Sequence, residues 1–318
     1  MKTNTQTEFE VNVKEGLSDY PKHLHSKFIY NKEGDELFKK IMKLPEYYLT
    51  QAEFDILQQN KKEICQHFYA KDGFDLIELG AGDGQKTKLI LQELVDQKMD
   101  FNYLPIDISQ NVLDDLEKNI NKEMPDVSIK CQQGSYFDVL KDLSSYNKRK
   151  KVIIVLGSNI GNLLHEEAID FLQQIQQSMA AFDMLFMGFD QKKHPQKIVD
   201  AYNDSHGVTE AFNKNLLKRI NNEFIADFNL DQFMHWESYD PETGTARSFL
   251  ISKQNQRVNI DQLDMKVDFH KWETIHTEIS QKYNDHVVNW LAEKSQLHVD
   301  TSFSDTDELY KNYVFKTD

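Results

Sequence analysis

The sequence is poor in cysteine and in positive charge. Only two of its 318 residues are cysteine, Cys65 and Cys131, which excludes a disulfide framework and favours free thiols in a reducing compartment. Lysine and arginine together number 37 against 52 acidic residues, so the formal net charge is −15. A surface of that sign repels a phosphate backbone, and we therefore expect no nucleic acid partner.

Long apolar segments are also missing. No stretch approaches the roughly 18 apolar residues that cross a bilayer, and residues 1–13 are polar, without the apolar centre of a signal peptide. The short basic cluster at 148–151 directly precedes a predicted buried strand and is best explained as a solvated loop. We expect a cytoplasmic protein with no membrane partner, and a monomer. The length allows one large or two moderate domains.

The most informative segment is residues 75–87, DLIELGAGDGQKT. Its apolar residues predict a central strand of a parallel sheet, covered on both faces. Gly80, Gly82 and Gly84 remove side chains where the chain must turn sharply and where a ligand can touch the main chain. Apolar residues then recur at helical spacing from Lys86 onward. The segment therefore predicts a strand, a glycine turn and a helix start that together could hold a small ligand.

Four further strands are predicted, each followed by small or polar residues. They cover residues 101–109, 127–132, 152–156 and 184–190. The carboxyl ends of parallel strands line one edge of an open sheet, where doubly wound folds bind ligands. Asp107 lies in the second strand, about 20 residues past the glycines, where such folds place an acid on a ribose hydroxyl. Ser135 and Tyr136 follow the third strand as a predicted adenine-side loop. The predicted fold class is α/β, with a doubly wound, Rossmann-like domain.

Two nucleotide cofactors suit this domain, NAD and S-adenosylmethionine. The dinucleotide fingerprint asks for a third glycine three residues after the second, whereas the spacing here is GxGxG with Asp83 between the last two glycines. Glu78 before such a turn is the usual opening of S-adenosylmethionine-dependent methyltransferases, and Lys86 could meet the methionine carboxylate. We therefore predict S-adenosylmethionine as the cofactor. The alternative is that Glu78 and Lys86 are only strand-end and helix-surface charges.

The rest of the chain combines helices and strands. Helices are predicted over residues 195–226 and 287–294, a pair of strands over 233–260 around the turn 240–244, and further strands over 266–280, 297–299 and 313–315. Many methyltransferase domains close with an antiparallel hairpin, so the last segment should rejoin the sheet. The predicted domains are an N-terminal segment of the substrate domain (1–55), a cofactor-binding domain (56–190), a substrate-binding domain (191–283) and a C-terminal return to the sheet (284–318).

Several longer motifs occur in order along nearly the whole chain. They are Tyr30 with GDELF at 34–38, LPEYYLT at 44–50 with Glu53, LGSNIGN at 156–162, AYND at 201–204, GVTEAFN at 207–213 and ETIHTEISQKY at 273–283. In these motifs the chain resembles the histidine-specific, S-adenosylmethionine-dependent methyltransferases, which are the L-histidine Nα-methyltransferases of the ergothioneine pathway. The resemblance implies a class I methyltransferase domain with an inserted α+β substrate-binding domain.

The resemblance also implies a role for individual residues. S-adenosylmethionine would be held by Glu78, Gly80, Gly82, Lys86, Asp107, Ser135 and Tyr136. The amino-acid substrate would be held by Tyr30, Tyr47, Asn162, Tyr202, Glu278 and Ser280. Tyr47 and Asn162 are the predicted catalytic residues, because they would orient the lone pair of the attacking amine. The implied activity is Nα-methylation of L-histidine, up to the trimethylated product hercynine.

These residue types suit that chemistry. An imidazole has two polar nitrogens, and Glu278 and Ser280 can accept a hydrogen bond from one and bond the other. An analogue without those nitrogens would lose both bonds, at a large cost compared with a mismatch of shape. Methyl transfer from a sulfonium is an in-line displacement that depends mainly on positioning, so no metal is needed. The histidines are scattered, with no cysteine or acid cluster beside them, and we predict no metal site.

Each predicted substrate residue has a simpler alternative. Tyr30 and Tyr47 could be core or rim tyrosines, Tyr202 could serve packing alone, Asn162 could cap a helix that begins near Leu164, and Glu278 could be a solvent-facing strand position. Alternative functions are N-methylation of another aromatic amino acid such as tryptophan, NAD-dependent oxidation and amino-acid binding without catalysis. One departure from the family bears on the N-methylation of another aromatic amino acid. Ser248 stands where relatives often carry methionine near the imidazole, which could widen the side-chain pocket.

Overall fold

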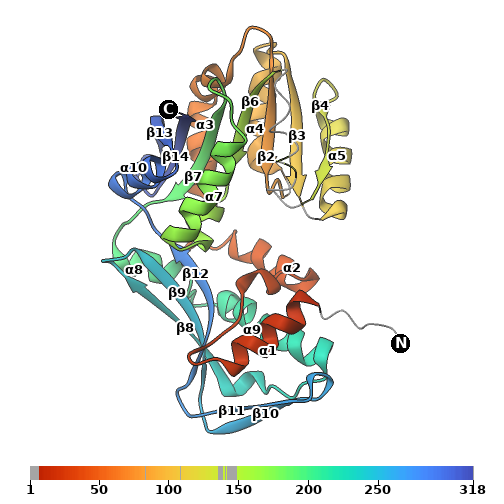
Figure 1. Ribbon diagram of the computed structural model, residues 1–318, viewed down its shortest axis with the longest axis vertical. Coiled ribbons are helices and arrows are strands. Elements are labelled where there is room, and N and C mark those ends of the chain that lie inside the picture. Colours follow the sequence, from red (N-terminus) through yellow and green to blue (C-terminus); the bar gives the residue numbers. More distant parts are fainter. Residues whose placement is uncertain are drawn as a thin grey trace. The chain divides into compact units, whose positions relative to one another are not determined.

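The computed structural model of the protein describes residues 7–317 except residues 83, 108, 135–138, 140 and 142–148. The chain divides into two compact units (Figure 1). Unit 1 comprises Met1–Tyr48 and Lys193–Ser280, and unit 2 comprises Leu49–Lys192 and Gln281–Asp318. The boundaries between the units follow Tyr48, Lys192 and Ser280. The boundaries predicted from the sequence follow residues 55, 190 and 283.

Unit 2 is built on one large sheet whose strands are ordered β13-β14-β7-β6-β2-β3-β4, with β5 pairing with β3 (Figure 1). The strands are β2 (Phe74–Leu79), β3 (Phe101–Asp107), β4 (Ser128–Ile129), β5 (Gln132–Gln133), β6 (Lys150–Val155), β7 (Met184–Asp190), β13 (Leu297–Ser304) and β14 (Tyr310–Thr317). The strands from β4 to β7 are parallel, whereas β14 is antiparallel to both of its neighbours. The α/β class and the largely parallel, doubly wound sheet agree with the sequence prediction.

The strand order reverses between β2 and β6. From β2 the chain first adds β3 on one side, and it later crosses back to place β6 on the other side of β2. The loops after β2 and β6 therefore leave the sheet next to each other at its carboxyl edge, which is where open α/β sheets bind ligands. Residues 80–84 form the first of these loops, and residues 156–162 lie in the second.

Helices cover both faces of this sheet (Figure 1). They are α3 (Leu49–Phe68), α4 (Gln85–Asp96), α5 (Gln110–Glu123), α7 (His165–Gln177) and α10 (Asp285–Lys294). Helices α3, α4 and α5 share an apolar core with one face, and α7 and α10 share a second core with the other face. Because both faces are covered, β2 and β7 are buried along their whole lengths, which explains the nearly continuous apolar sequence of β7.

One strand of this sheet was predicted incorrectly. Residues 127–132 do not form one strand but two short ones, β4 and β5, which pair with different parts of β3. Between them the N–H of Lys130 donates to the carbonyl oxygen of Tyr103 at 2.8 Å. The side chains of β4 and β5 are exposed or half-buried, so this edge of the sheet is held by main-chain hydrogen bonds more than by burial.

Unit 1 contains a four-stranded sheet of order β1-β12-β9-β8 and a separate pair, β10-β11 (Figure 1). Its helices are α1 (Glu8–Ser18), α2 (Lys32–Ile41), α8 (Pro195–Ala201) and α9 (Val208–Phe224). Its strands are β1 (Lys22–His23), β8 (Phe233–Asp240), β9 (Thr245–Ser252), β10 (Gln256–Ile260), β11 (Met265–Phe269) and β12 (Thr274–Gln281). One apolar core, which includes Val13, Leu216 and Ile275, joins α1 and α9 to these strands.

The single strand predicted over residues 266–280 is wrong. The chain forms β11 and β12 instead, separated by a turn at residues 270–273. In this turn Trp272 has a φ of +73°, a left-handed conformation that interrupts a strand. The N–H of His270 donates to the Glu273 carboxylate at 2.8 Å and fixes the turn. The two strands predicted over 233–260 are the hairpin β8–β9, but that range also contains β10, which pairs with β11.

Candidate active site

The glycine turn after β2 has open main chain at one position. Gly82 is exposed with a φ of +54°, and among the described residues no atom lies within 4 Å of the place its Cβ would take. Gly84, with a φ of +67°, is different, because a Cβ there would lie 2.5 Å from Cδ1 of Leu116. Glycine at 84 thus lets α4 and α5 pack closely, while glycine at 82 leaves room for a ligand to reach the backbone.

Glu78 lies in the core beneath this turn. Thr87 donates from Oγ1 to its Oε1 at 2.5 Å, and the Tyr103 hydroxyl donates to its Oε2. Burial raises the pKa of Glu78 to about 7, against the lowering effect of these two hydrogen bonds and of Lys86. Glu78 therefore links β2, β3 and α4, and the alternative of a simple strand-end charge is wrong. Its contact with the cofactor stays a prediction.

Replacing Glu78 with glutamine should flatten the dependence of stability on pH. The pKa of Glu78 in the folded protein is about 7, above its ordinary value of 4.5, so the folded state holds this proton more tightly than the unfolded state. The stability that Glu78 contributes therefore falls as pH rises between these values. Over that range the wild-type protein should lose about 3 kcal/mol more than Glu78→Gln. Urea unfolding at several pH values measures this, and equal slopes for both proteins would contradict it.

Lys86 is paired with an acid from another helix. Its Nζ lies 2.5 Å from Oε2 of Glu53, a fully buried carboxylate on α3. Lys86 is therefore held in place on α4, and its contact with the cofactor stays a prediction. Lys86 stands in the first turn of α4, directly after the glycine turn. An ammonium group has three donors, so its pairing with Glu53 is compatible with the predicted contact to the methionine carboxylate.

Asp107 ends β3, which is hydrogen-bonded to β2 beside the glycine turn. Its Oδ1 accepts the N–H of Ser109 at 2.9 Å, a local turn that fixes the carboxylate at the start of α5. This position suits the predicted contact with a ribose hydroxyl. The predicted adenine-side residues Ser135 and Tyr136 lie outside the described residues. The described groups, which are open backbone, a carboxylate and an ammonium, fit S-adenosylmethionine.

Asn162 lies in the loop after β6. It ends the short 3-10 helix η2 (Asn159–Asn162), and the Tyr283 hydroxyl anchors this helix by donating to the carbonyl oxygen of Ile160 at 3.1 Å. The next helix, α7, is capped by Glu167, whose carboxylate accepts the N–H of Leu164 at 2.9 Å. The alternative that Asn162 is only a helix cap is therefore wrong. Its role toward the substrate stays a prediction.

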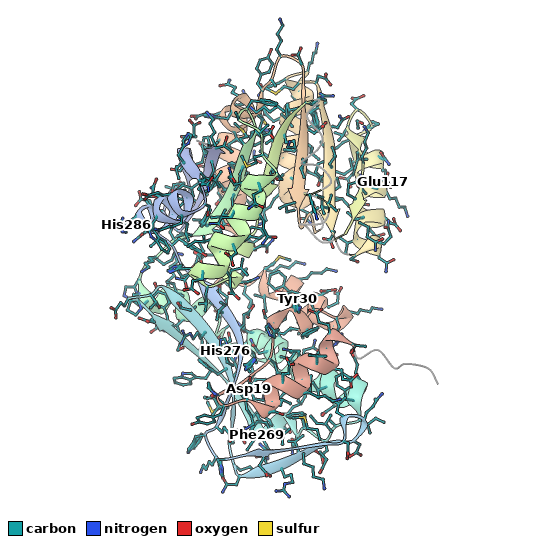
Figure 2. The ribbon with its side chains drawn as sticks, viewed as in Figure 1. Asp19, Tyr30, Glu117, Phe269, His276 and His286 are labelled. Atoms are coloured by element: carbon teal, nitrogen blue, oxygen red, sulfur yellow. The ribbon has the colours of Figure 1, made fainter. Side chains whose placement is uncertain are left out.

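The predicted substrate residues of unit 1 lie around Tyr202. The hydroxyl oxygens of Tyr202 and Ser280 are 2.8 Å apart and share a hydrogen bond. The ring of Tyr47 meets that of Tyr202 edge-on, with centroids 6.1 Å apart. Tyr30, two residues before α2 (Figure 2), packs edge-on against Phe212 of α9 with ring centroids 5.4 Å apart. Side chains far apart in the sequence thus come close together within this unit.

Glu278 belongs to the same group of side chains. Desolvation by the surrounding protein raises the pKa of Tyr30 well above its ordinary value. The Glu278 carboxylate is the second cause, and Tyr47 and Tyr202 have smaller effects. The pKa of Tyr30 is raised although 39% of the residue is exposed. The Tyr30 hydroxyl is therefore a neutral phenol at physiological pH and can donate a hydrogen bond. Glu278 itself is half-buried on β12, so it is not a freely solvated strand position.

Two buried residues that the sequence analysis missed hold Tyr202 and the segment after it. The Nε2 of His235 lies 2.8 Å from the Tyr202 carbonyl oxygen, and because a carbonyl only accepts, this nitrogen carries the proton. Asp204 accepts the N–H groups of Val208 and Thr209 at 3.0 and 2.7 Å and so caps α9. An aspartate just before a helix is a recognisable capping signal. A histidine on a strand gives no comparable signal.

The described part of the chain has neither a cluster of metal-ligating side chains nor a membrane-spanning helix. No group of three or more histidine, cysteine or acidic side chains there could hold a metal ion. No helix there is both long and apolar enough to cross a membrane. The predicted absence of a metal stays a prediction.

The sheet, its antiparallel closing strand and the glycine turn at the point of strand reversal define a Rossmann-like methyltransferase domain. A model of the family described as histidine-specific, S-adenosylmethionine-dependent methyltransferases matches residues 9–317. The chain belongs to this family, and S-adenosylmethionine is its cofactor.

Curated relatives match the chain over most of its length. The histidine N-alpha-methyltransferase of Mycolicibacterium smegmatis is 35% identical over 283 residues, which cover 88% of this chain and 86% of the relative. The protein of the same name from Mycobacterium tuberculosis is 34% identical over 286 residues, covering 90% and 88%. Ergothioneine biosynthesis protein 1 of Schizosaccharomyces pombe is 28% identical over 300 residues, covering 92% of this chain but 38% of that longer protein.

Proposed function

We propose that the protein methylates the α-amine of L-histidine, up to the trimethylated product hercynine, as in ergothioneine biosynthesis. The observation that carries the proposal is the group of side chains in unit 1 around Tyr202, which contains Tyr30, Tyr47, Glu278 and Ser280. The names of the two mycobacterial relatives support it, since both match the chain over more than four fifths of their own length.

The imidazole is proposed to lie against Glu278 and Ser280. The Glu278 carboxylate accepts a hydrogen bond from the imidazole N–H. The Ser280 hydroxyl, which shares a hydrogen bond with Tyr202, completes the polar contacts of the ring. The Tyr30 hydroxyl, whose pKa the Glu278 carboxylate raises, supplies a further donor. An amino acid without ring nitrogens would forgo these bonds, which is the physical basis for a preference for histidine.

The amine is proposed to be oriented by Tyr47 and Asn162, with Tyr202 contributing to the hold on the substrate carboxylate. When bound, S-adenosylmethionine supplies an electrophilic methyl group, and Gly82, Lys86 and Asp107 are among the residues that would hold it. The task of the protein is then positioning, and the amine proton leaves to solvent. The rings of Tyr47 and Tyr202, whose centroids are 6.1 Å apart, suit a growing cationic amine.

A second candidate function is N-methylation of another aromatic amino acid such as tryptophan. The observation that favours it is the surroundings of Ser248. This serine is buried on β9 and donates from Oγ to the buried Glu237 carboxylate at 2.6 Å. A small side chain engaged with Glu237 takes less space than the methionine that relatives often carry at this position. The side-chain pocket is therefore expected to accept a larger substrate ring.

The experiment that decides between these candidates is a methylation assay with the purified protein. It is incubated with S-adenosylmethionine and each aromatic amino acid in turn, and the products are followed by mass spectrometry. We expect histidine to gain methyl groups stepwise up to three, where the reaction stops because the nitrogen has no lone pair left. Absence of any mass gain on histidine would refute the substrate, and faster methylation of tryptophan would favour the second candidate.

We also propose that the protein works in the cytoplasm as a monomer, with neither nucleic acid nor membrane as a partner. The support is the strongly acidic composition, with a net charge of −15, which disfavours anionic polymers and anionic lipid surfaces alike. Size-exclusion chromatography with light scattering tests the monomer. A mass twice that of the chain would refute it.

A further inference from the structure

A buried carboxylate to which the proposed mechanism gives no role lies beneath the two loops at the point of strand reversal. Glu53 is on α3 of unit 2 and is fully buried. Its Oε2 accepts hydrogen bonds from the Lys86 ammonium at 2.5 Å and from the N–H of Gly157 at 2.8 Å. Lys86 lies in the first turn of α4, the helix after β2, and Gly157 is the second residue of the loop after β6. One oxygen atom therefore connects the start of α4 with the loop after β6.

The other oxygen of Glu53 is fixed as well. Oε1 accepts from Nδ2 of Asn312, a buried residue of β14, at 2.9 Å. Gly188 on the neighbouring strand β7 leaves the space that this arrangement needs. A Cβ on Gly188 would lie 2.3 Å from Oε1 of Glu53 and 2.3 Å from the Tyr310 hydroxyl oxygen. Donors from α4, the β6 loop and β14 thus converge on a single side chain, which fixes its position.

Lys86 differs from two lysines of unit 2 whose ion pairs are buried on both sides. Lys151 pairs with Asp183 at 2.9 Å and Lys282 pairs with Asp190 at 2.7 Å, and the side chains of both pairs are 0–1% exposed. In the pair of Lys86 with Glu53 the acid is 0% exposed, but the lysine side chain is 22% exposed. The Lys86 ammonium is therefore held from below by a buried anion and remains accessible on another side.

We propose that Glu53 is a positioning residue for the cofactor, which holds the Lys86 ammonium over the start of the β6 loop for contact with the carboxylate of S-adenosylmethionine. A Cβ on Gly157 would lie 3.8 Å from Nζ of Lys86, which places the ammonium over that loop. Lysine is flexible, and fixing it before the ligand arrives removes an entropic cost of binding. The inference rests on the assignment of Lys86 to the cofactor in the proposed function.

The first test is Glu53→Gln. Glutamine keeps the shape and can still accept from Asn312, but its amide nitrogen cannot accept from Lys86 and Gly157. We expect the Kd for S-adenosylhomocysteine, measured by titration calorimetry, and the KM for S-adenosylmethionine to rise by about 10-fold to 100-fold. The KM for the amino acid should change by less than about 2-fold. Unchanged affinity for S-adenosylhomocysteine in folded Glu53→Gln would overturn the inference.

The matched control is Asp183→Asn, which breaks a buried ion pair of the same unit at the opposite edge of the sheet, where β6 and β7 begin. It should lower the melting temperature and leave the affinity for S-adenosylhomocysteine within about 2-fold of wild type. If this variant weakens the affinity as much as Glu53→Gln does, loss of general stability explains the effect and the inference is overturned.

A double-mutant cycle with Lys86→Met separates the inference from the function on which it rests. If Glu53 acts through Lys86, adding Glu53→Gln to Lys86→Met should change the affinity by less than about 2-fold, and additive losses would overturn the inference. Wild-type affinity in Lys86→Met would instead refute the assignment of Lys86. Should Glu53→Gln fail to fold, Glu53→Asp keeps the charge with a shorter side chain, and wild-type affinity in that variant would overturn the inference.

Discussion

Replacing Glu278 with glutamine is expected to lower kcat/KM for L-histidine by about 100-fold, because a charge-assisted hydrogen bond to the imidazole is worth about 2–3 kcal/mol. Glutamine keeps the length of the side chain but supplies a neutral amide in place of a carboxylate. Since Glu278 belongs to unit 1 and the glycine turn to unit 2, binding of S-adenosylhomocysteine should stay within about 2-fold of wild type. Steady-state kinetics with histidine and calorimetry with S-adenosylhomocysteine measure the two quantities.

Glu273→Gln is the matched control for this prediction. Glu273 directly precedes β12, pairs with Lys22 and accepts the N–H of His270, so its replacement weakens the start of the strand that carries Glu278. We expect kcat/KM for histidine to change by less than about 3-fold in this control. An equal loss in both variants would mean that the strand, not the imidazole contact, is affected. Full activity on tryptophan in Glu278→Gln would favour the second candidate function.

The second large effect is expected from Gly82→Val, which should weaken binding of S-adenosylhomocysteine by roughly 100-fold or more. The described residues leave the place of a Cβ at Gly82 open to at least 4 Å. A valine side chain would occupy the space in which we predict the cofactor to approach the main chain. Its branched Cβ would also disfavour the φ of +54° that the turn adopts. Titration calorimetry on the folded variant provides the measurement.

Gly207→Val separates the two causes of weaker binding, which are the filling of ligand space and the strain of a positive φ. Gly207 lies in unit 1 with a φ of +72°, and the nearest atom to a Cβ there is Oε2 of Glu210 at 3.9 Å. Both variants therefore carry a comparable backbone penalty of about 1–2 kcal/mol, visible as a lower melting temperature. Only Gly82→Val should lose affinity for S-adenosylhomocysteine. Equal affinities in the two variants would show that Gly82 does not face the ligand.

The sheet of unit 2 could be predicted where its strands carry their own signal. All seven residues of β7 are buried, and its predicted and observed limits coincide at residues 184–190. Strands β4 and β5 have two residues each with little burial, whereas the alternating apolar residues at 127, 129 and 131 are typical of one continuous strand. The break between β11 and β12 depends on one left-handed residue, Trp272. A tryptophan normally favours a strand, and its type gave no warning of the turn.

The site was predictable only in part, for a different reason. The glycine turn and Asp107 follow from local chemistry, because backbone freedom and strand-end position are properties of short segments. The tyrosines and Glu278 could be selected only by resemblance to a family, since a residue type does not reveal which side chains lie opposite it in space. Glu53 stood within one of the matching motifs without a role. Its partners come from as far away as Asn312, and no local pattern encodes such a pairing.

The interior position of β14 has a consequence for synthesis on the ribosome. This strand is translated after β7 and β13, yet it lies between them in the finished sheet. A nascent chain must therefore keep the edge of β7 uncovered until β14 emerges, and an uncovered apolar edge recruits other chains. Messages cut short before residue 310 should yield aggregated product that chaperones must hold, even though most of the sheet has already been made.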